Sequence, residues 1–182
     1  MRKHIIFDLE TLSVRTNASI VSIAAVAFDI DNGEIFDEIK IDINPNEWNK
    51  NNRHIDGYTI KWWLNQDNEV VKDIFGVKEN LYDLKTALSK VSEFVDKHIT
   101  NELTVWGNGS TMDITILQSA YEYFDMSTPW KYWQVNDVRT IVALIPEIKE
   151  NMNFIGQRHS PIDDCKHEIR YLVATLNNIN RK

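Results

Sequence analysis

The stretch HIIFDLET, residues 4–11, gives the first indication of the fold of this chain. An apolar run is followed by two acids, Asp8 and Glu10, one residue apart. Side chains alternate along a β-strand, so Asp8 and Glu10 share a face with Ile6, and the intervening apolar residues share the other. This pattern predicts a buried strand with two carboxylates near its carboxyl end, where open α/β sheets bind ligands. Paired carboxylates suit Mg²⁺ or Mn²⁺, although acids are also common where a strand simply ends in water.

A third acid, Asp113, closes the stretch WGNGSTMD, residues 106–113. We expect a short buried strand, a tight turn through Gly107–Gly109 and a helix over 111–124. Ser110 is a suitable N-cap and would place Asp113 at the third helical position, where a capping box explains the acid fully. The same position points a carboxylate toward the carboxyl end of the sheet. A structural and a functional interpretation are therefore both open at this point.

The stretch HSPIDD, residues 159–164, repeats this arrangement. Ser160 is expected to cap a helix, Pro161 to take its first position and Asp163 to close a capping box. The cap does not need Asp164. His159 lies on the loop before the helix, and an imidazole exchanges protons near neutral pH, although a lone loop histidine is usually inert.

Hydrophobic periodicity gives the remaining layout. The expected strands span residues 4–9, 19–28, 34–43, 103–106 and 133–136. The expected helices span residues 59–65, 69–75, 81–99, 111–124, 137–144 and 161–178, with a loop between the last two. A hairpin turn is expected at Asp31-Asn32-Gly33. This order predicts an α/β fold with a mixed five-stranded sheet flanked by helices.

Composition limits the possible classes of protein. With 182 residues, of which 43% are hydrophobic, the chain is expected to form one domain over residues 1–182. Asp8 interrupts the first apolar run, so neither a signal peptide nor a membrane span is expected there. The one cysteine, Cys165, excludes an intrachain disulfide and suits a cytoplasmic location.

The formal net charge of −7 is unusual for a protein that would bind nucleic acid tightly along its length. Part of the excess comes from the acids described above, which divalent cations would neutralise. The remainder favours a short substrate held at its end. Local basic side chains could form a positively charged path to the site, although each is also explained as a solvated surface charge: Lys50, Arg53, His54, Lys61, Arg139, Arg158 and Lys166.

Together these residues resemble the DEDDh exonucleases. The pattern is Asp-x-Glu on the first strand, an Asp on a mid-chain helix, and His-x-x-x-x-Asp near the end, and it covers residues 4–178. The stretches TIKWWLNQ (59–66), WGNGSTMD (106–113) and YWQVNDVRT (132–140) are similar to the phage exonuclease A and Rv2179c-like exoribonuclease branch. The spacing from His159 to Asp164 fits the histidine subtype.

The resemblance implies a ribonuclease-H-like fold and a two-metal 3'-5' exonuclease that releases 5'-mononucleotides from single-stranded DNA or RNA. It implies that two divalent cations, Mg²⁺ or Mn²⁺, are bound by Asp8, Glu10, Asp113 and Asp164, with Asp8 bridging them. The same comparison assigns His159 as the general base. All five residues are thereby expected to be catalytic.

Substrate contacts are also expected. By resemblance, Thr11 would hydrogen-bond the terminal 3' hydroxyl and Leu12 would pack on the terminal base. One of the adjacent Trp62 and Trp63 would stack on a base, because two neighbours on a helix cannot face the same way. Arg139 would contact a phosphate.

Several alternatives stay open from sequence. A catalytically silent nucleic-acid-binding or adaptor protein on the same scaffold is the alternative to an enzyme, although none of the five residues is missing. The preference for DNA or RNA is not decided, since no contact to a 2' hydroxyl can be assigned. The many aromatic residues would permit a homodimer, but no assembly motif is present.

Overall fold

The computed structural model describes residues 3–98, 103–109 and 111–180. Its sheet has five strands in the order β3-β2-β1-β4-β5. Their bounds are β1 Lys3–Thr11, β2 Ile20–Asp29, β3 Ile35–Asp42, β4 Thr104–Gly107 and β5 Val135–Asp137. The pairs β1–β2 and β2–β3 are antiparallel, whereas β1–β4 and β4–β5 are parallel. The prediction of a mixed five-stranded sheet is confirmed.

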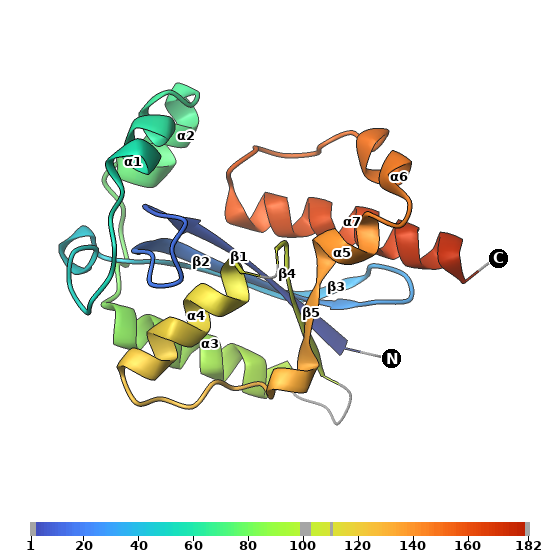
Figure 1. Cartoon of the computed structure of the whole chain (residues 1–182), viewed down its shortest axis with the longest axis horizontal. Helices are drawn as coiled ribbons and strands as arrows, with labels where there is room; N and C mark the ends of the chain where they lie inside the picture. Colours follow the sequence, from blue (N-terminus) through green and yellow to red (C-terminus); the bar gives the residue numbers. More distant parts are fainter. Residues whose placement is uncertain (1–2, 99–102, 110, 181–182) are drawn as a thin grey trace.

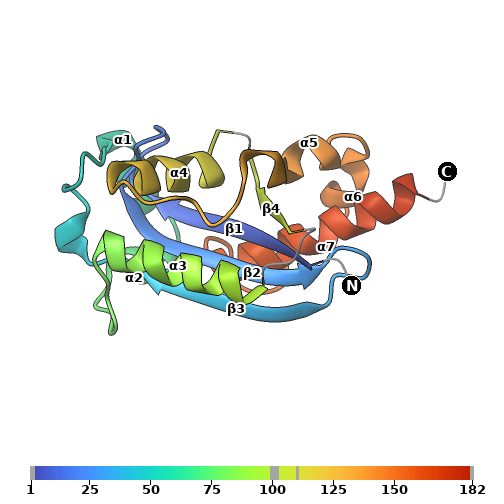
Figure 2. The same cartoon turned by 90° about the horizontal axis from the view of Figure 1, so that it is seen from below.

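Helices cover both faces of this sheet (Figures 1 and 2). The α-helices are α1 Gly57–Leu64, α2 Asn68–Phe75, α3 Leu84–His98, α4 Asp113–Tyr123, α5 Val138–Val142, α6 Pro146–Glu150 and α7 Pro161–Ile179. Two 3-10 helices are η1 Pro45–Glu47 and η2 Tyr132–Gln134. Helices α3 and α4 lie on one face and α5, α6 and α7 on the other, while α1 and α2 stand beyond the carboxyl end of β1 (Figure 1).

The two faces of β1 belong to two different hydrophobic cores. Ile5 and Phe7 pack with α3 and α4, whereas Ile6 packs with α5 and α7. Because the side chains alternate, Asp8 and Glu10 point to the same side as Ile6. Both acids therefore face the layer that contains α7.

A third, smaller core holds α1 and α2 against the exit of β1. It contains Leu12, Val21, Trp63, Val70 and Ile74, all buried. This contact places α1 next to the carboxyl end of the central strand, where the two acids lie.

The structure corrects several of the expected boundaries. Helix α6 falls in the segment expected to be a loop, because Pro146 takes the first helical position and starts a single turn that sequence periodicity cannot detect. The helix expected over 111–124 begins at Asp113. Of the helix expected over 81–99, residue 99 lies outside the described residues. The hairpin turn at Asp31–Gly33 is confirmed, with Gly33 at a φ of +79°.

Of the helices in the described segments, none combines the length and apolar character needed to cross a membrane.

Replacing Leu88 with Ala tests the core between α3 and the sheet. Leu88 is completely buried, so removing its side chain leaves a cavity and should lower the free energy of unfolding by about 2–5 kcal/mol. The same change at exposed Leu144 should lower it by less than about 0.5 kcal/mol. Urea denaturation of both variants measures the difference, and equal losses would contradict this assignment of the core.

Candidate active site

Three elements bring the acids of the sequence together at the carboxyl end of β1. Asp8 and Glu10 come from β1, and Asp164 comes from the first turn of α7. One potential ligand atom from each of Glu10, Asp164 and His159 lies within 4.8 Å of the others. Asp113, at the start of α4, completes a set that we call the acidic cluster: Asp8, Glu10, Asp113 and Asp164.

The carboxylate of Asp113 is tied to two strands at once. Its Oδ1 accepts a hydrogen bond of 3.1 Å from the backbone N–H of Leu9 on β1. Its Oδ2 accepts one of 3.2 Å from the backbone N–H of Asn108, which follows β4. The expected capping box is wrong, because Asp113 is the first helical residue and Met112 is its N-cap; Ser110 lies outside the described residues. The acid is thus held at the cluster by backbone donors from β1 and the β4 end.

The loop before α7 also differs from the expected capping box. Ser160 is the N-cap by position, but its side chain makes no capping hydrogen bond. Asp163 instead accepts a hydrogen bond of 2.9 Å from the backbone N–H of Gln157. Gly156 has a φ of +103°, and a Cβ there would lie 2.5 Å from the Asp163 carboxyl carbon, so glycine is required. This contact fixes the loop that carries His159 onto the first turn of α7.

His159 lies between the acidic cluster and two tryptophans. Its ring centroid is 5.2 Å from that of Trp62 and 5.7 Å from that of Trp63, with both pairs nearly perpendicular. Trp63 is buried, and its indole N–H donates a 2.9 Å hydrogen bond to the carbonyl of Thr11. Helix α1 therefore orients the histidine as well as bordering the site.

Burial and mutual repulsion disfavour the charged forms of the cluster. Burial is the largest cause in each of the four acids. It raises the pKa of Asp113 and of Asp164 to about 6. Neighbouring carboxylates add to the effect for the other two, raising the pKa of Glu10 to about 9 and that of Asp8 well above its usual value. Because the charged forms of all four acids are disfavoured in the metal-free protein, bound cations would stabilise them.

The imidazole of His159 is shifted in the opposite sense. Burial, and then the charge of Arg158, lower the pKa of His159 below its usual value. The ring is consequently neutral near pH 7, the form in which it accepts a proton.

The structure adds Asn108 and Glu168, which the sequence reasoning missed. Glu168 lies one turn after Asp164 on α7, and this i, i+4 spacing was the signal available in the sequence. Its Oε1 accepts a hydrogen bond from the Asn108 side chain. Its Oε2 is buried with no hydrogen-bond partner among the described residues. Burial, with a further contribution from Asp113, raises the pKa of Glu168 to about 8. Asn108 therefore links Asp113 to a fifth carboxylate, which is itself buried.

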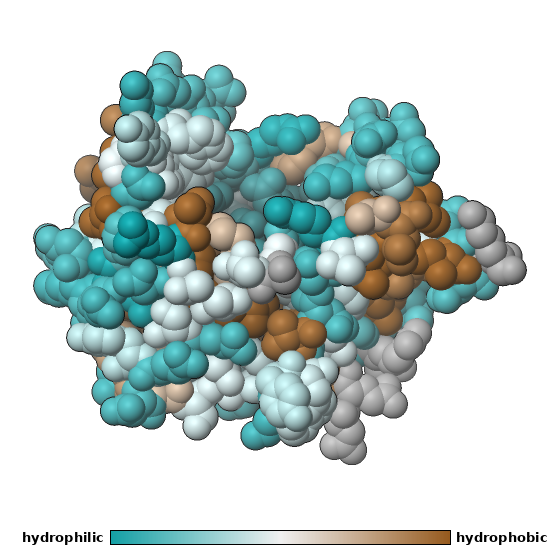
Figure 3. Space-filling view, in the orientation of Figure 1, coloured by the Kyte–Doolittle hydropathy of each residue, from teal (hydrophilic) through white to brown (hydrophobic). Residues whose placement is uncertain are grey.

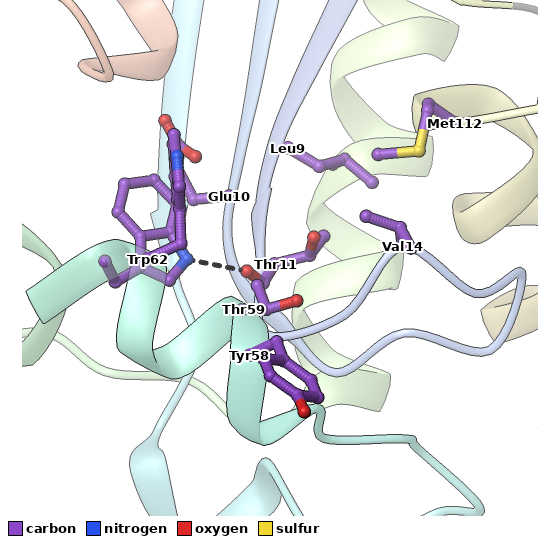
Figure 4. Close-up of a pocket in the computed structure, with 9 residues that line it drawn as sticks. Leu9, Glu10, Thr11, Val14, Tyr58, Thr59, Trp62 and Met112 are labelled. Carbon is purple, nitrogen blue, oxygen red and sulfur yellow. Dashed lines mark hydrogen bonds between the residues drawn. The ribbon is translucent and has the colours of Figure 1, made fainter. Parts of the chain in front are cut away.

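An aromatic groove of 460 Å³ opens beside the acidic cluster (Figure 4). The residues that line it are Leu9, Glu10, Thr11, Val14, Tyr58, Thr59, Trp62, Trp63 and Met112. Figure 4 shows the side chains of α1 on one side, those of Leu9, Val14 and Met112 on the other, and Thr11 between them. Trp62 is 47% exposed and Trp63 only 2%, so the exposed ring surface of the pair belongs mainly to Trp62.

The residues expected to contact substrate lie in three different places. Leu12 is 1% exposed and packs in the α1–α2 core, so the expectation that it packs on a base is wrong. Thr11 lines the groove, and its hydroxyl donates a 2.7 Å hydrogen bond to the carbonyl of Ser13. Arg139 is exposed outside the groove and donates a 2.8 Å hydrogen bond to the carbonyl of Asn108. Arg139 therefore borders the opposite side of the cluster.

Known proteins similar to this chain are nucleases. Residues 3–176 match the family model of the Rv2179c-like 3'-5' exoribonuclease domain. The exodeoxyribonuclease of Enterobacteria phage T4 is 24% identical over 207 residues, covering 94% of this chain and 88% of the relative.

Solved structures give the same fold. The nuclease domain of 3'hExo, a DEDDh family member bound to rAMP, aligns with a TM-score of 0.68 at 16% identity, over 97% of this chain and 92% of that one. E. coli Exonuclease I in complex with a 5cy-dA13 oligonucleotide aligns with a TM-score of 0.64 at 13% identity, over 96% of this chain and 41% of that one. The expected ribonuclease-H-like fold is confirmed. Since the family model spans nearly all of its length, the chain belongs to the Rv2179c-like 3'-5' exoribonuclease domain family and is a 3'-5' exonuclease.

Proposed function

We propose that this exonuclease removes 5'-mononucleotides from the 3' end of single-stranded nucleic acid, with Asp8, Glu10, Asp113 and Asp164 binding two divalent cations, Mg²⁺ or Mn²⁺. The observation that carries the proposal is the convergence of Glu10, Asp164 and His159 within 4.8 Å, beside the aromatic groove that Glu10 lines. Asp8 and Asp113 belong to the same cluster, because Asp113 contributes to the raised pKa of both Asp8 and Glu10. The groove volume of 460 Å³ suits a single terminal nucleotide.

The residues of the acidic cluster fit divalent cations. All four donors are carboxylates, the oxygen ligands that Mg²⁺ and Mn²⁺ prefer. Burial raises the pKa of each acid, and neighbouring carboxylates raise the pKa of Asp8 and Glu10 further. Bound cations would favour the charged forms. When bound, the cations would activate water and neutralise the charge that develops on the phosphate. Glu168, whose buried Oε2 has no hydrogen-bond partner in the described part of the chain, lies close enough to Asp8 to raise the pKa of that acid.

His159 is proposed to accept the proton of the attacking water. Its pKa is lowered, so the neutral ring that this role requires predominates near pH 7. Perpendicular packing against Trp62 and Trp63 limits the rotation of the imidazole. The fixed loop backbone before α7 further restricts its position.

The aromatic groove is proposed to hold the terminal nucleotide. The exposed rings of Trp62 and Tyr58 offer surfaces on which a base can stack, at about 1–3 kcal/mol for each stacked base. Thr11, between the two walls, has a hydroxyl oxygen that can accept a hydrogen bond from the terminal 3' hydroxyl. The rAMP on 3'hExo and the oligonucleotide on Exonuclease I support single-stranded 3' ends as the substrate class.

An assay of 5'-labelled single-stranded DNA and RNA of equal sequence tests this function. With Mg²⁺ or Mn²⁺ we expect a ladder that shortens from the 3' end, and the faster substrate decides between DNA and RNA. Asp8→Asn removes a carboxylate without changing side-chain volume, so it should abolish the ladder while the circular dichroism spectrum stays native. Full activity of this variant or persistence of the ladder in excess chelator would refute the metal assignment.

Replacing His159 with Ala tests the proton acceptor. The rate should fall about 10²- to 10⁴-fold because general-base catalysis is lost. Binding of Mn²⁺, followed by calorimetry, should stay within a few-fold of wild type. Loss of Mn²⁺ binding in this variant would instead make His159 a metal ligand, an arrangement that its closeness to Glu10 and Asp164 also permits.

The stability of the metal-free protein should fall as the pH rises. Glu10 has a pKa of about 9 when folded against 4.5 in the unfolded chain, so the folded state binds the proton more tightly. The stability that this proton provides is complete below pH 4.5 and is lost as the pH rises toward 9. Between pH 5 and pH 8, the melting temperature of the metal-free wild type should therefore fall on the order of 5 °C more than that of Glu10→Gln. If the melting temperatures of the two proteins depend on pH in the same way, Glu10 is already charged in the metal-free protein and the prediction is contradicted.

A further inference from the structure

A second hollow borders the acidic cluster on the side away from the aromatic groove. Its volume is 580 Å³ and its wall includes Asp164 and Glu168 together with residues of α6, α7 and the loop between them. A smaller hollow of 170 Å³ shares Asn108, Lys149, Glu150 and Tyr171 with it and adds Arg139. We call the two together the polar hollow. Figure 3 shows this face of the molecule, with hydrophilic side chains along the depression between α1–α2 and α6.

Three cationic side chains line the polar hollow, and each is held by something other than a carboxylate. The Lys149 ammonium lies 5.1 Å from the ring centroid of Tyr171, and the Arg158 guanidinium 5.0 Å from that of Phe154. Arg139 is hydrogen-bonded to a backbone carbonyl.

Five lysines in the described part of the chain are neutralised by carboxylates. In the described segments, ion pairs with carboxylates are formed by Lys40, Lys50, Lys78, Lys97 and Lys166, but not by Arg139, Lys149 or Arg158. Lys166, on the same helix as the hollow, bonds Glu38 and is thereby occupied. The polar hollow therefore presents positive charge that remains available to an anion.

The exonuclease reaction requires a second path for the substrate. If the aromatic groove holds the terminal nucleotide, the rest of the strand has to leave the acidic cluster through another opening. A third hollow, of 370 Å³, contains His159 and Arg158 but also Asp67 and Glu69. The two acids of the third hollow would repel phosphates. Charge complementarity thus favours the polar hollow, which carries the three cations Arg139, Lys149 and Arg158. Of its three carboxylates, Asp164 is a proposed cation ligand, Glu168 is buried, and Glu150 is exposed.

We propose that the polar hollow binds the phosphodiester backbone of the strand on the 5' side of the cleaved bond, with Lys149 and Arg139 contacting its phosphates. This inference rests on the proposed exonuclease function. It explains how a chain with a net charge of −7 binds a polyanion: positive charge is concentrated where the strand leaves the active site.

Binding of a twelve-nucleotide strand to proteins that cannot hydrolyse it tests the proposal. Each protein carries Asp8→Asn, and fluorescence anisotropy with Mg²⁺ gives Kd as a function of salt. Adding Lys149→Gln should raise the Kd for the twelve-mer about 3- to 10-fold and reduce the slope of log Kd against log salt by about 1. Arg139→Gln should act in the same direction. The Kd of a dinucleotide, measured by competition, should change less than that of the twelve-mer.

Lys85→Gln, on α3 across the sheet, removes the same charge and serves as the control. If Lys149→Gln and Arg139→Gln leave the twelve-mer Kd at the control value, the strand does not cross the polar hollow and the inference fails. An equal rise in Kd for the dinucleotide and the twelve-mer would also overturn it, because the substitution would then affect the binding of the terminal nucleotide. If the parent Asp8→Asn protein binds neither strand while wild type degrades neither, it is the proposed function that fails.

Discussion

The alternation of side chains along β1 is the constraint on which the rest of the molecule depends. β1 is the central strand, hydrogen-bonded to β2 on one side and β4 on the other, and both of its faces are buried. Ile5 and Phe7 cannot leave the α3–α4 core without exposing apolar surface, so Asp8 and Glu10 must face α7. A shift of one residue would exchange the two faces. Packing of the apolar residues thus fixes the direction of the carboxylates.

This arrangement brings like charges together in a poorly solvated place. Asp8, Glu10 and Glu168 all have a raised pKa, with burial as the main cause. Backbone donors from Leu9 and Asn108 offset part of the effect of burial on Asp113, whose pKa is still raised to about 6. Buried carboxylates at such short spacing destabilise the fold, and natural proteins tolerate such destabilising arrangements mainly at functional sites. Bound cations would stabilise the charged forms of these carboxylates.

The surroundings of the acidic cluster differ in chemistry on its two sides. Helix α1 supplies the aromatic wall that includes Trp62, and α5 and α6 supply Arg139 and Lys149 on the other side. A base with a π-face suits the first wall, and a phosphate suits the second. The overall negative charge of the chain is compatible with a nucleic-acid substrate because charge acts locally at short distances in salt.

Much of the site followed from sequence because it depends on local pattern. The period-two alternation of HIIFDLET placed Asp8 and Glu10 on one face, and the family-like motifs put Asp113 and Asp164 in the same set. Single-turn elements are harder to predict from sequence. Helix α6 was missed because five residues are too few to show helical periodicity.

What depends on contacts between distant segments was decided only by the tertiary structure. Leu12 lies only two residues after Glu10 in sequence, yet α1 and α2 bury it in a core. Trp62 and Trp63 are neighbours, yet only packing decides which one is exposed. The partnership of Asn108 with Glu168 joins residues 60 positions apart. The sequence determined which chemical groups are available and which strand carries them; burial and long-range hydrogen bonds, which depend on the whole fold, determined which of them face the substrate.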